Sequence, residues 1–384
     1  MPKQLERGVL RAFPIQMRPR AATCAVVSLT LVLGASTGTQ AVADPIAEFY
    51  TGKTIRMIIR SGVGGGYDQY SRLLGRHIGK HIPGNPHVLP VNMPGGGGIV
   101  AANYVANVAP RDGTILTIVS QGLVVDQALG LNKTFKADLR SFGWVGNLSK
   151  SNQLTVAWHT SKTKTLKDAM TRETLIGATG AGSVSTQLPA FYNNVLGTKF
   201  KIVHGYPDGS DVNMAMERNE VEGRGTNPWA SYRAMTPRYV TDKMIVPLIQ
   251  AGLKKEDDLP DVPLLLDVVK PEDRPLAEFM SKAVSVGRPI ATPPGTPPER
   301  LKALRRAFDA ALKDPEFIRE AETQRAEIES MDGEELERIV HELIGAPQDT
   351  LDRVKVALQP KDKDMSAAPK PAKAANGKPE AAKE

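Results

Sequence analysis

The chain has 384 residues, with 49 Lys and Arg against 42 Asp and Glu, a formal net charge of +7 and 41% hydrophobic residues. This length exceeds one small domain and suits two lobes that each bury a core, and the apolar fraction excludes a wholly disordered chain. A single cysteine excludes a disulfide-stapled scaffold. The positive net charge raises nucleic-acid binding as a hypothesis, which depends on where the charges lie.

The first 43 residues have the pattern of an export signal. Four arginines between positions 7 and 20 precede an apolar run at 21–34, and Ala41 and Ala43 supply an A-x-A cleavage site. The run is too short and too rich in Ala, Ser and Thr to make a good membrane span. We therefore predict a Sec-type signal peptide cleaved after Ala43 and a periplasmic mature protein. Met17 is an alternative start, with more usual signal-peptide proportions.

The C-terminal residues 360–384 are mostly Lys, Ala and Pro, a composition that predicts a disordered tail. The first 43 residues hold five bases and one acid, and residues 360–384 hold six and four. Residues 44–359 therefore carry 38 bases and 37 acids, a net charge of +1, and nucleic-acid binding loses its main support. Cys24 lies in the leader, so the mature chain has no thiol for catalysis, as suits an oxidising compartment.

The chain after the leader alternates strands, glycine-rich loops and helices. An apolar, β-rich run is followed by a glycine cluster and then by apolar residues at helical spacing, and this order occurs twice. It is typical of a parallel α/β sheet. The expected elements are strands at 54–59, 87–92 and 114–119 and helices at 70–82 and 100–108.

A second lobe is predicted from residue 151. It is expected to contain strands at 154–158, 174–178 and 201–204 and helices at 165–170, 186–196 and 212–218, with a polar, glycine-containing stretch at 222–229 after Val221. The chain is expected to return to the first lobe near 244–249 and to end in helices at 298–312, 316–325 and 334–344. The first lobe is thus predicted to comprise 44–150 and 242–359 and the second 151–241, with a cleft between them.

Four glycine- or serine-rich turns each follow a strand and open a helix, near 62–68, 95–98, 180–185 and 205–211. Glycine lets the backbone approach a ligand, and a helix N-terminus offers unpaired N–H groups with partial positive charge. Such turns can bind a carboxylate or a phosphate without a lysine or arginine. Four of them across two lobes favour a ligand site in the cleft.

Several polar and aromatic residues, in these turns or in the stretch at 222–229, have two interpretations. Asp68 and Asp208 are each either a helix N-cap or a polar contact to the ligand. Arg224 either forms a bidentate pair with a carboxylate or lies at the surface. Tyr206 and Trp229 either form a wall of the cleft or pack in the core.

The candidate motifs for catalysis, nucleotide binding and metal binding each lack a required residue. Ala47 replaces the first glycine of a P-loop, and Tyr67 replaces the last glycine of a dinucleotide fingerprint. His77 and His81 have the i, i+4 spacing of zinc ligands, but no third ligand or HExxH glutamate accompanies them. Ser183 lacks the G-x-S-x-G surroundings of a hydrolase nucleophile. We therefore expect no cofactor, no metal and no catalytic residue.

The order of several short motifs resembles the Bug-type receptors, the extracytoplasmic substrate-binding proteins of tripartite tricarboxylate transporters. The resemblance spans roughly residues 50–345. Each motif is moderately specific, whereas their order is very specific. The motifs lie at 53–59, 64–68, 92–98, 110–114, 259–263, 293–300 and 313–317.

This resemblance implies a type II periplasmic-binding-protein fold, an α/β Venus flytrap that closes on a small carboxylate and delivers it to membrane permease subunits. It further implies that the first two glycine loops hold the carboxylate, partly through main-chain N–H groups and bridging waters, and that loops of the second lobe contribute. Together with the polar residues described above, the candidate ligand-binding set is Gly64, Gly65, Gly66, Tyr67, Asp68, Gly95, Gly96 and Gly97 from the first lobe and Gly180, Gly182, Ser183, Tyr206, Asp208 and Arg224 from the second.

The sequence departs from the family pattern where Arg60 and Ser61 replace a Pro-rich entry, at the longer connection 81–86, and at 224–229. The first and last departures fall beside the expected pocket and leave the ligand's identity open. Two other functions also stay open, a periplasmic hydrolase or transferase that uses the same cleft, and a sensory module that reports to a membrane receptor.

Overall fold

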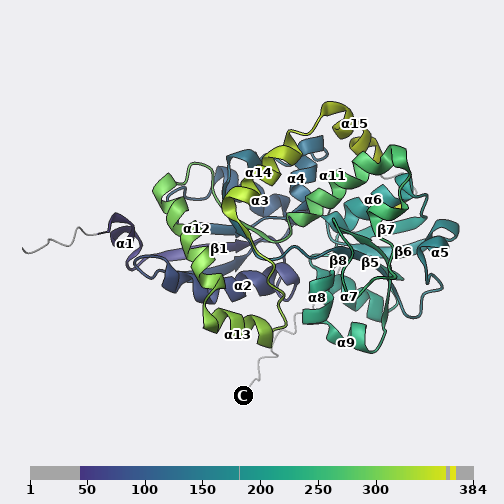
Figure 1. Ribbon diagram of the computed structural model, residues 1–384, viewed down its shortest axis with the longest axis horizontal. Coiled ribbons are helices and arrows are strands. Elements are labelled where there is room, and N and C mark those ends of the chain that lie inside the picture. The colour runs from purple at the N-terminus through teal and green to yellow at the C-terminus, as the bar shows by residue number, and fades with distance from the viewer. Residues whose placement is uncertain (1–43, 181, 360–363, 369–384) are drawn as a thin grey trace, which may run out of the picture. The chain divides into compact units, whose positions relative to one another are not determined.

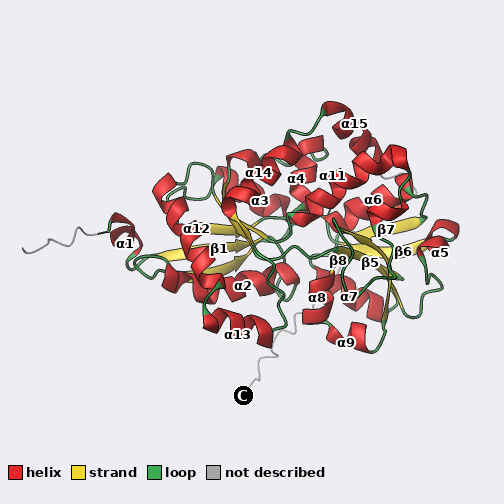
Figure 2. Cartoon of the chain, viewed as in Figure 1, coloured by secondary structure: helices red, strands yellow, loops and turns green. Residues whose placement is uncertain are grey.

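The computed structural model describes residues 44–180, 182–359 and 364–368, all of which fall within one compact unit. These residues form two six-stranded β-sheets, each with helices packed against it (Figure 1, Figure 2). The first lobe denotes the first sheet with its helices, and the second lobe the other sheet with its helices. Within the described ranges, no helix is both long and apolar enough to cross a membrane. The predicted leader at 1–43 lies outside the described residues.

The first sheet has the strand order β11-β4-β10-β3-β1-β2. β1 pairs in parallel with β2 and β3, whereas β10 is antiparallel to both β3 and β4. The three strands expected at the start of this lobe are confirmed, and each is followed by a helix. The strands are β1 (Thr54–Ile59), β2 (His87–Asn92), β3 (Ile115–Ile118), β4 (Gly143–Asn147), β10 (Pro289–Thr292) and β11 (Met331–Asp332).

The helices of the first lobe include all five that the sequence predicted there. α2 buries Tyr70, Leu73 and Leu74, which lie on one face at helical spacing, in a core that also contains Phe308 of α12. The helices are α1 (Pro45–Tyr50), α2 (Gly66–Ile78), α3 (Ile99–Asn107), α4 (Gly122–Leu129), α12 (Pro298–Leu312), α13 (Pro315–Thr323) and α14 (Gly333–Ile344), with the short 3₁₀ turns η1 (Gly79–His81), η2 (Gly96–Gly98) and η3 (Leu139–Ser141).

The second sheet has the order β12-β7-β6-β8-β5-β9. The expected strands at 154–158, 174–178 and 201–204 are confirmed as β5 (Gln153–Trp158), β6 (Thr174–Ala178) and β7 (Phe200–His204). The other strands are β8 (Gly223–Pro228), β9 (Ile245–Ala251) and β12 (Met365–Ala367), and the helices are α5 (Leu166–Thr171), α6 (Val184–Val195), α7 (Gly209–Glu217), α8 (Trp229–Met235) and α9 (Pro237–Thr241).

The two sheets repeat one topology. In each, three parallel strands lie in the order second, first, third, which is β2-β1-β3 in one sheet and β7-β6-β8 in the other. The next strand in each sheet is antiparallel to its neighbours and is the one that has just crossed from the other lobe, β10 in the first and β5 in the second. This exchange of strands makes two connected lobes rather than two independent domains.

The predicted return to the first lobe near residue 242 is wrong. β9 pairs antiparallel with β5 and completes the second sheet, so the chain returns only at β10. Nothing in the apolar run at 244–249 indicated to which of the two sheets it belongs, because a buried strand has the same composition in either. The connecting segment carries α10 (Leu265–Val268), η4 (Pro271–Asp273) and α11 (Arg274–Ser285).

The C-terminal part of the chain also belongs partly to the second lobe. α15 (Gln348–Ala357) packs against both α4 and α6, and the Asn194 amide donates hydrogen bonds to the carbonyls of Ala357 and Gln359. β12 then extends the second sheet in parallel with β7. The prediction of a disordered tail is therefore wrong for 364–368, where backbone pairing with an open sheet edge compensates for a composition that buries little.

Most of the glycine-containing stretch at 222–229 forms a buried strand, β8. A Cβ atom on Gly223 would lie 2.2 Å from the Val156 carbonyl oxygen, and one on Gly225 would lie 2.1 Å from the Ser185 carbonyl oxygen. Glycine is thus needed because neighbouring backbone approaches closely on either side, a reason that strand propensity cannot reveal.

Phe308 provides a test of how α12 is held on the first sheet. Its ring is fully buried and lies so close to β4 that a Cβ atom on Gly146 would be 2.3 Å from a ring carbon. We expect Phe308→Ala to lower the free energy of unfolding by about 3–5 kcal/mol, since it leaves a cavity in the core. Urea denaturation of Phe308→Ala beside Ile318→Ala, a residue 42% exposed on α13, measures this difference. Equal losses in the two variants would contradict the assignment of Phe308 to the core.

Candidate functional site

A cavity lies between the two lobes, at the carboxyl ends of their parallel strands. Its lining comes from segments that directly follow β1, β3, β6 and β7, and from β8 itself. Open α/β sheets bind ligands at this edge. About 60 Å³ of the cavity admits the centre of a water-sized molecule, which is room for several waters or a small solute.

Arg60 is the first of three arginines that line this cavity, and only 6% of it is exposed. It follows the last residue of β1. Its guanidinium lies 4.4 Å from the centre of the Tyr67 ring, and its Nη1 donates a hydrogen bond of 3.3 Å to Ser120 Oγ. The buried Nε atom of Arg60 has no hydrogen-bond partner among the described residues.

Arg288 is the most buried of the three, at 3% exposure, and immediately precedes β10. Its backbone N–H donates to Asn147 Oδ1 at 2.7 Å, and its guanidinium lies 3.9 Å from the centre of the Tyr70 ring. Its Nη2 donates to Ser231 Oγ of α8, so this side chain of the first lobe reaches the second.

Arg224 faces the cavity from β8 and is 8% exposed. Its Nη1 donates to Asn213 Oδ1 at 2.8 Å, while its buried Nε atom lacks a partner within the described part of the chain. Burial lowers the pKa of Arg224, and the nearby Tyr232 and Asp208 act in the opposite direction. Because Arg224 is buried, the interpretation that it lies at the surface is wrong.

The cavity has an excess of buried positive charge. Among the described residues, no carboxylate lies within 4.0 Å of Arg60, Arg224 or Arg288, and Asp208 is the one acid in the described lining. Buried charges are normally paired, because desolvation of an isolated ion is costly. The remaining lining is rich in hydroxyl and amide groups, among them Gln121, Gln153, Thr179, Ser183, Ser185, Thr226 and Asn227. This environment suits a small anion.

Asp208 is a helix N-cap, as one of its two interpretations predicted, and it also lines the cavity. Its carboxylate accepts the Ser210 N–H at 3.1 Å as the N-cap of α7, and the residue also lines the cavity. The same carboxylate approaches the first lobe, since a Cβ atom on Gly65 would lie 1.9 Å from Asp208 Oδ1.

Asp68, by contrast, is neither the N-cap of α2 nor part of the cavity lining. Gly65 occupies the cap position. The Asp68 carboxylate accepts the Gly64 N–H at 3.1 Å and pairs with Arg72 at 2.9 Å, so its charge is used within the first lobe.

The second and third glycine loops contact each other across the lobes. The Gly182 N–H donates to the Gly96 carbonyl at 3.3 Å, and a Cβ atom on Gly180 would lie 2.2 Å from the Gly97 nitrogen. Gly97 also has φ +71°, which favours glycine. These residues therefore let the two backbones approach, a role different from the approach to a ligand that the sequence indicated.

The predicted site residues thus fall into three groups. One group lines the cavity, namely Gly66, Tyr67, Ser183, Asp208 and Arg224. Gly64 and Gly65 line an adjoining space of about 210 Å³ that also contains Gly66 and Arg224. The others, which do not line these two cavities, are Asp68, Gly95, Gly96, Gly97, Gly180, Gly182 and Tyr206, and Tyr206 packs in the apolar core of the second lobe.

Two arginines of the cavity were not among the predicted site residues. The sequence offered a feature that could have identified Arg60 as a site residue, because it directly follows a buried strand and begins the first glycine loop. Arg288 had none, since its neighbours in sequence contain no motif and only the crossing into β10 brings it to the cavity. Trp229 is buried and donates to Asp258, so it packs rather than lines this cavity.

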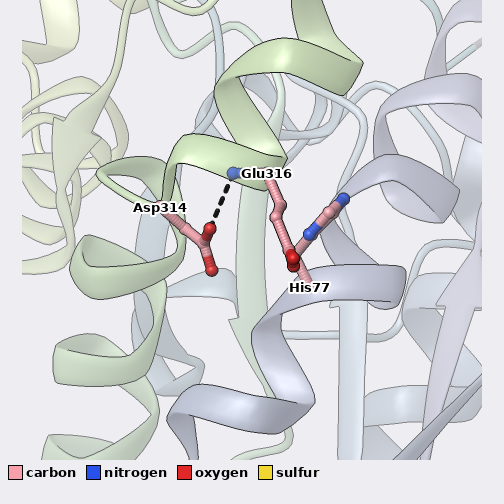
Figure 3. A group of neighbouring side chains, drawn as sticks. All are labelled: His77, Asp314 and Glu316. Carbon is pink, nitrogen blue, oxygen red and sulfur yellow. Dashed lines mark hydrogen bonds between the residues drawn. The ribbon is translucent and has the colours of Figure 1, made fainter. Parts of the chain in front are cut away.

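His77 belongs to an ion-pair cluster on the first lobe, where its ring lies near Asp314 and Glu316 (Figure 3). His77 Nε2 lies 2.6 Å from a Glu320 oxygen, and the Lys80 ammonium lies 2.7 Å from Asp314 Oδ2 and also contacts Glu316. The ammonium holds the pKa of the Asp314 carboxyl well below its usual range. The cluster joins α2 and η1 to α13 with its charges compensated, which is the arrangement of a structural contact rather than a metal site.

Comparison with known proteins identifies the fold. No known family profile matches the chain, and no curated protein sequence matches it. Among solved structures, it is similar to R. palustris Rpa4515 with adipate, at 18% identity over 79% of this chain and 97% of that one, with a TM-score of 0.63. It is also similar to MatC (Rpa3494) from Rhodopseudomonas palustris with bound malate, at 19% identity, 80% and 99% coverage and a TM-score of 0.62. A third is the periplasmic binding protein BugD, at 19% identity, 83% and 100% coverage and a TM-score of 0.62.

Of these three neighbours, BugD is described as a periplasmic binding protein, and the other two as carrying adipate and malate. At such identities the likeness shows a shared fold, so the predicted two-lobed α/β fold of periplasmic binding proteins is confirmed.

A substitution at Gly180 tests whether the close approach of the two lobes depends on the contact between the Gly97 and Gly180 loops. We expect Gly180→Ala to disfavour the approach of the lobes by roughly 1–3 kcal/mol, because its methyl group would overlap the Gly97 backbone. Small-angle X-ray scattering would then show a larger radius of gyration than that of the unmodified protein. Gly62→Ala is the matched control, since its Cβ atom would meet Asp208 Cβ at an ordinary 3.6 Å. Identical scattering curves for the two variants would exclude this role.

Proposed function

We propose that this protein is a periplasmic receptor that binds a small organic anion, a carboxylate, and delivers it to a tripartite tricarboxylate-type membrane transporter. The observation that carries the proposal is the cavity between the lobes, where three buried guanidinium groups have no carboxylate within 4.0 Å among the described residues. A bound anion would supply the missing negative charge.

The proposed binding residues come from both lobes. Arg60, Arg288 and Tyr67 belong to the first, and Arg224 and Ser183 to the second. Guanidinium groups match a carboxylate with two parallel N–H donors, and hydroxyl and amide groups supply further hydrogen bonds. A ligand that contacts both lobes binds their closed arrangement more tightly than the open one and shifts the population toward it. A receptor of this kind signals its loaded state to a membrane partner by its shape.

The structural neighbours support an anion as ligand. One of them carries adipate and another malate, and both share this chain's fold. The Sec-type leader and the periplasmic location predicted from the sequence fit the same role. Permease subunits are the proposed partners, and the two lobes are the proposed docking surface.

The groups around the cavity support binding rather than catalysis. The described lining holds no histidine, and the Ser183 and Ser185 hydroxyls hydrogen-bond each other at 2.9 Å. A serine nucleophile needs an adjacent base, and Asp208 is engaged as the N-cap of α7. The cavity thus offers charge and hydrogen bonds but no nucleophile–base pair within its described lining.

A panel of carboxylates tests the proposed ligand class. We expect at least one small carboxylate to bind the mature protein in isothermal titration calorimetry and to raise its Tm, since a ligand that binds the folded state stabilises it by mass action. Mass spectrometry should recover that ligand unaltered after prolonged incubation. No binding across the panel would contradict the receptor proposal, and conversion of the ligand would favour a hydrolase or transferase.

The mature N-terminus tests the proposed export. When the full chain is expressed in a Gram-negative host, we expect the periplasmic fraction to contain a protein that begins at Asp44, because the A-x-A site ends at Ala43. Edman sequencing of that fraction identifies the residue. Ala41→Leu should block processing, since the signal peptidase requires a small residue there. An unprocessed protein in the cytoplasmic fraction would contradict export.

A further inference from the structure

We propose that the described C-terminal residues 364–368, which contain β12, are a strap that fixes part of the cavity lining in place and thereby raises the affinity for the ligand. The lining concerned is the segment 205–208, which joins β7 to α7 and carries Asp208 into the cavity. The effect on affinity rests on the proposed function, whereas the effect on the segment is measured without any ligand.

The strap completes one edge of the second sheet. β12 pairs in parallel with β7, with Met365 opposite Ile202 and Ala367 opposite His204. The Ala368 N–H extends this pairing by donating to the His204 carbonyl at 2.8 Å. Within the described ranges, β12 is the partner of β7 on this side, so removal of the strap would leave β7 as an unpaired edge strand.

Side chains on both faces of the sheet help to anchor the strap. Met365 and Ala368 stand three positions apart in an extended segment, so they point to opposite faces. Met365 packs against the apolar core that includes Phe191, and Ala368 packs against the apolar cluster that includes Tyr206. Earlier in the chain, the end of α15 is fixed to the same lobe by the Asn194 amide. The strap is therefore attached to the second lobe by more than its backbone pairing.

The strap reaches the start of the cavity segment. β7 ends at His204, and Gly205 follows with φ +110°, a conformation that favours glycine. A Cβ atom on Gly205 would meet Ala368 at 4.0 Å, while the Gly205 N–H donates to the carbonyl of Thr179, which lines the cavity. Gly205 thus has the strap within van der Waals reach and is hydrogen-bonded to the lining, three residues before Asp208.

The cavity segment in turn positions two charged groups of the site. Asp208 caps α7 by accepting the Ser210 N–H, and Asn213 of α7 accepts a hydrogen bond of 2.8 Å from Arg224. A site that already has its binding geometry loses less conformational freedom when the ligand arrives. Loss of the strap would free an edge strand and the turn after it, so part of the binding free energy would be spent on ordering them.

Two truncations form a matched pair. A stop codon after Gln359 removes the strap, whereas a stop codon after Ala368 removes residues 369–384 and keeps it. We expect hydrogen–deuterium exchange over residues 200–208, measured without ligand, to be about tenfold or more faster in the shorter chain, because β7 loses its outer partner. Exchange in the longer chain should equal that of the unmodified protein.

Two proline substitutions test the pairing itself. The N–H groups of a strand alternate between its edges, so the Ser366 N–H faces β7 as that of Ala368 does, and the Ala367 N–H faces away. We expect Ser366→Pro to reproduce the fast exchange of the shorter chain, since proline removes a donor from the ladder. Ala367→Pro is the matched control and should leave the exchange unchanged. Circular dichroism checks that both variants are folded.

Binding distinguishes a strap that positions the site from one that only stabilises the fold. Succinate, malate and adipate are titrated calorimetrically into the unmodified protein and the four variants. We expect the shorter chain and Ser366→Pro to bind the tightest of the three roughly fivefold more weakly, with the two controls within about twofold of the unmodified protein. A merely stabilising strap would lower the Tm and leave Kd unchanged.

The outcomes separate this inference from the proposed function. Equal exchange over 200–208 in the two truncated chains would overturn the inference, and so would equal Kd values for the two chains. If the unmodified protein binds none of the three carboxylates, the proposed function fails for this set and the effect on affinity fails with it. The exchange measurements then still decide whether the strap orders the segment.

Discussion

Burial of three guanidinium groups around one small cavity is the constraint on which the arrangement of this protein depends. An isolated buried cation is costly, and the fold meets that cost only in part, through aromatic rings and neutral oxygens. Tyr67 and Tyr70 on α2 lie under Arg60 and Arg288, and Asn213 on α7 accepts from Arg224. Each arginine is thereby fixed in position, although no carboxylate of the described residues lies within 4.0 Å of it. The proposed anion would balance this positive charge.

The repeated topology explains why these arginines meet. Because both sheets have the same strand order, the carboxyl ends of their parallel strands point into one space between the lobes. Arg60 follows β1 in the first lobe and Asp208 follows β7 in the second, so each lies in the segment after a parallel strand. The crossing strands β5 and β10 connect the lobes, and Arg288 stands at the entrance to one of them. The connection between the lobes thus also supplies part of the site.

Glycines of the second and third loops serve the contact between the lobes. The loops at 95–98 and 180–182 were interpreted from sequence as places where backbone approaches an anion, and the structure brings parts of them against each other. Glycine is needed at both positions, because a side chain would overlap with what lies beside Gly97 and Gly180. Sequence could not say whether that neighbour was a ligand or another loop, since both need the same empty space.

The sequence by itself determined the α/β class and the succession of strands, glycine loops and helices in both lobes, because these follow from local periodicity and local turn chemistry. It also located Asp208 in the segment between a strand and a helix. Tertiary structure alone decided that β9 completes the second sheet, that Gly223–Pro228 is a buried strand, and that Arg288 joins Arg60 across more than two hundred residues. The physical reason is common to all three. Strand partners and the charge balance of a cavity depend on which distant segments meet, and no local pattern records that.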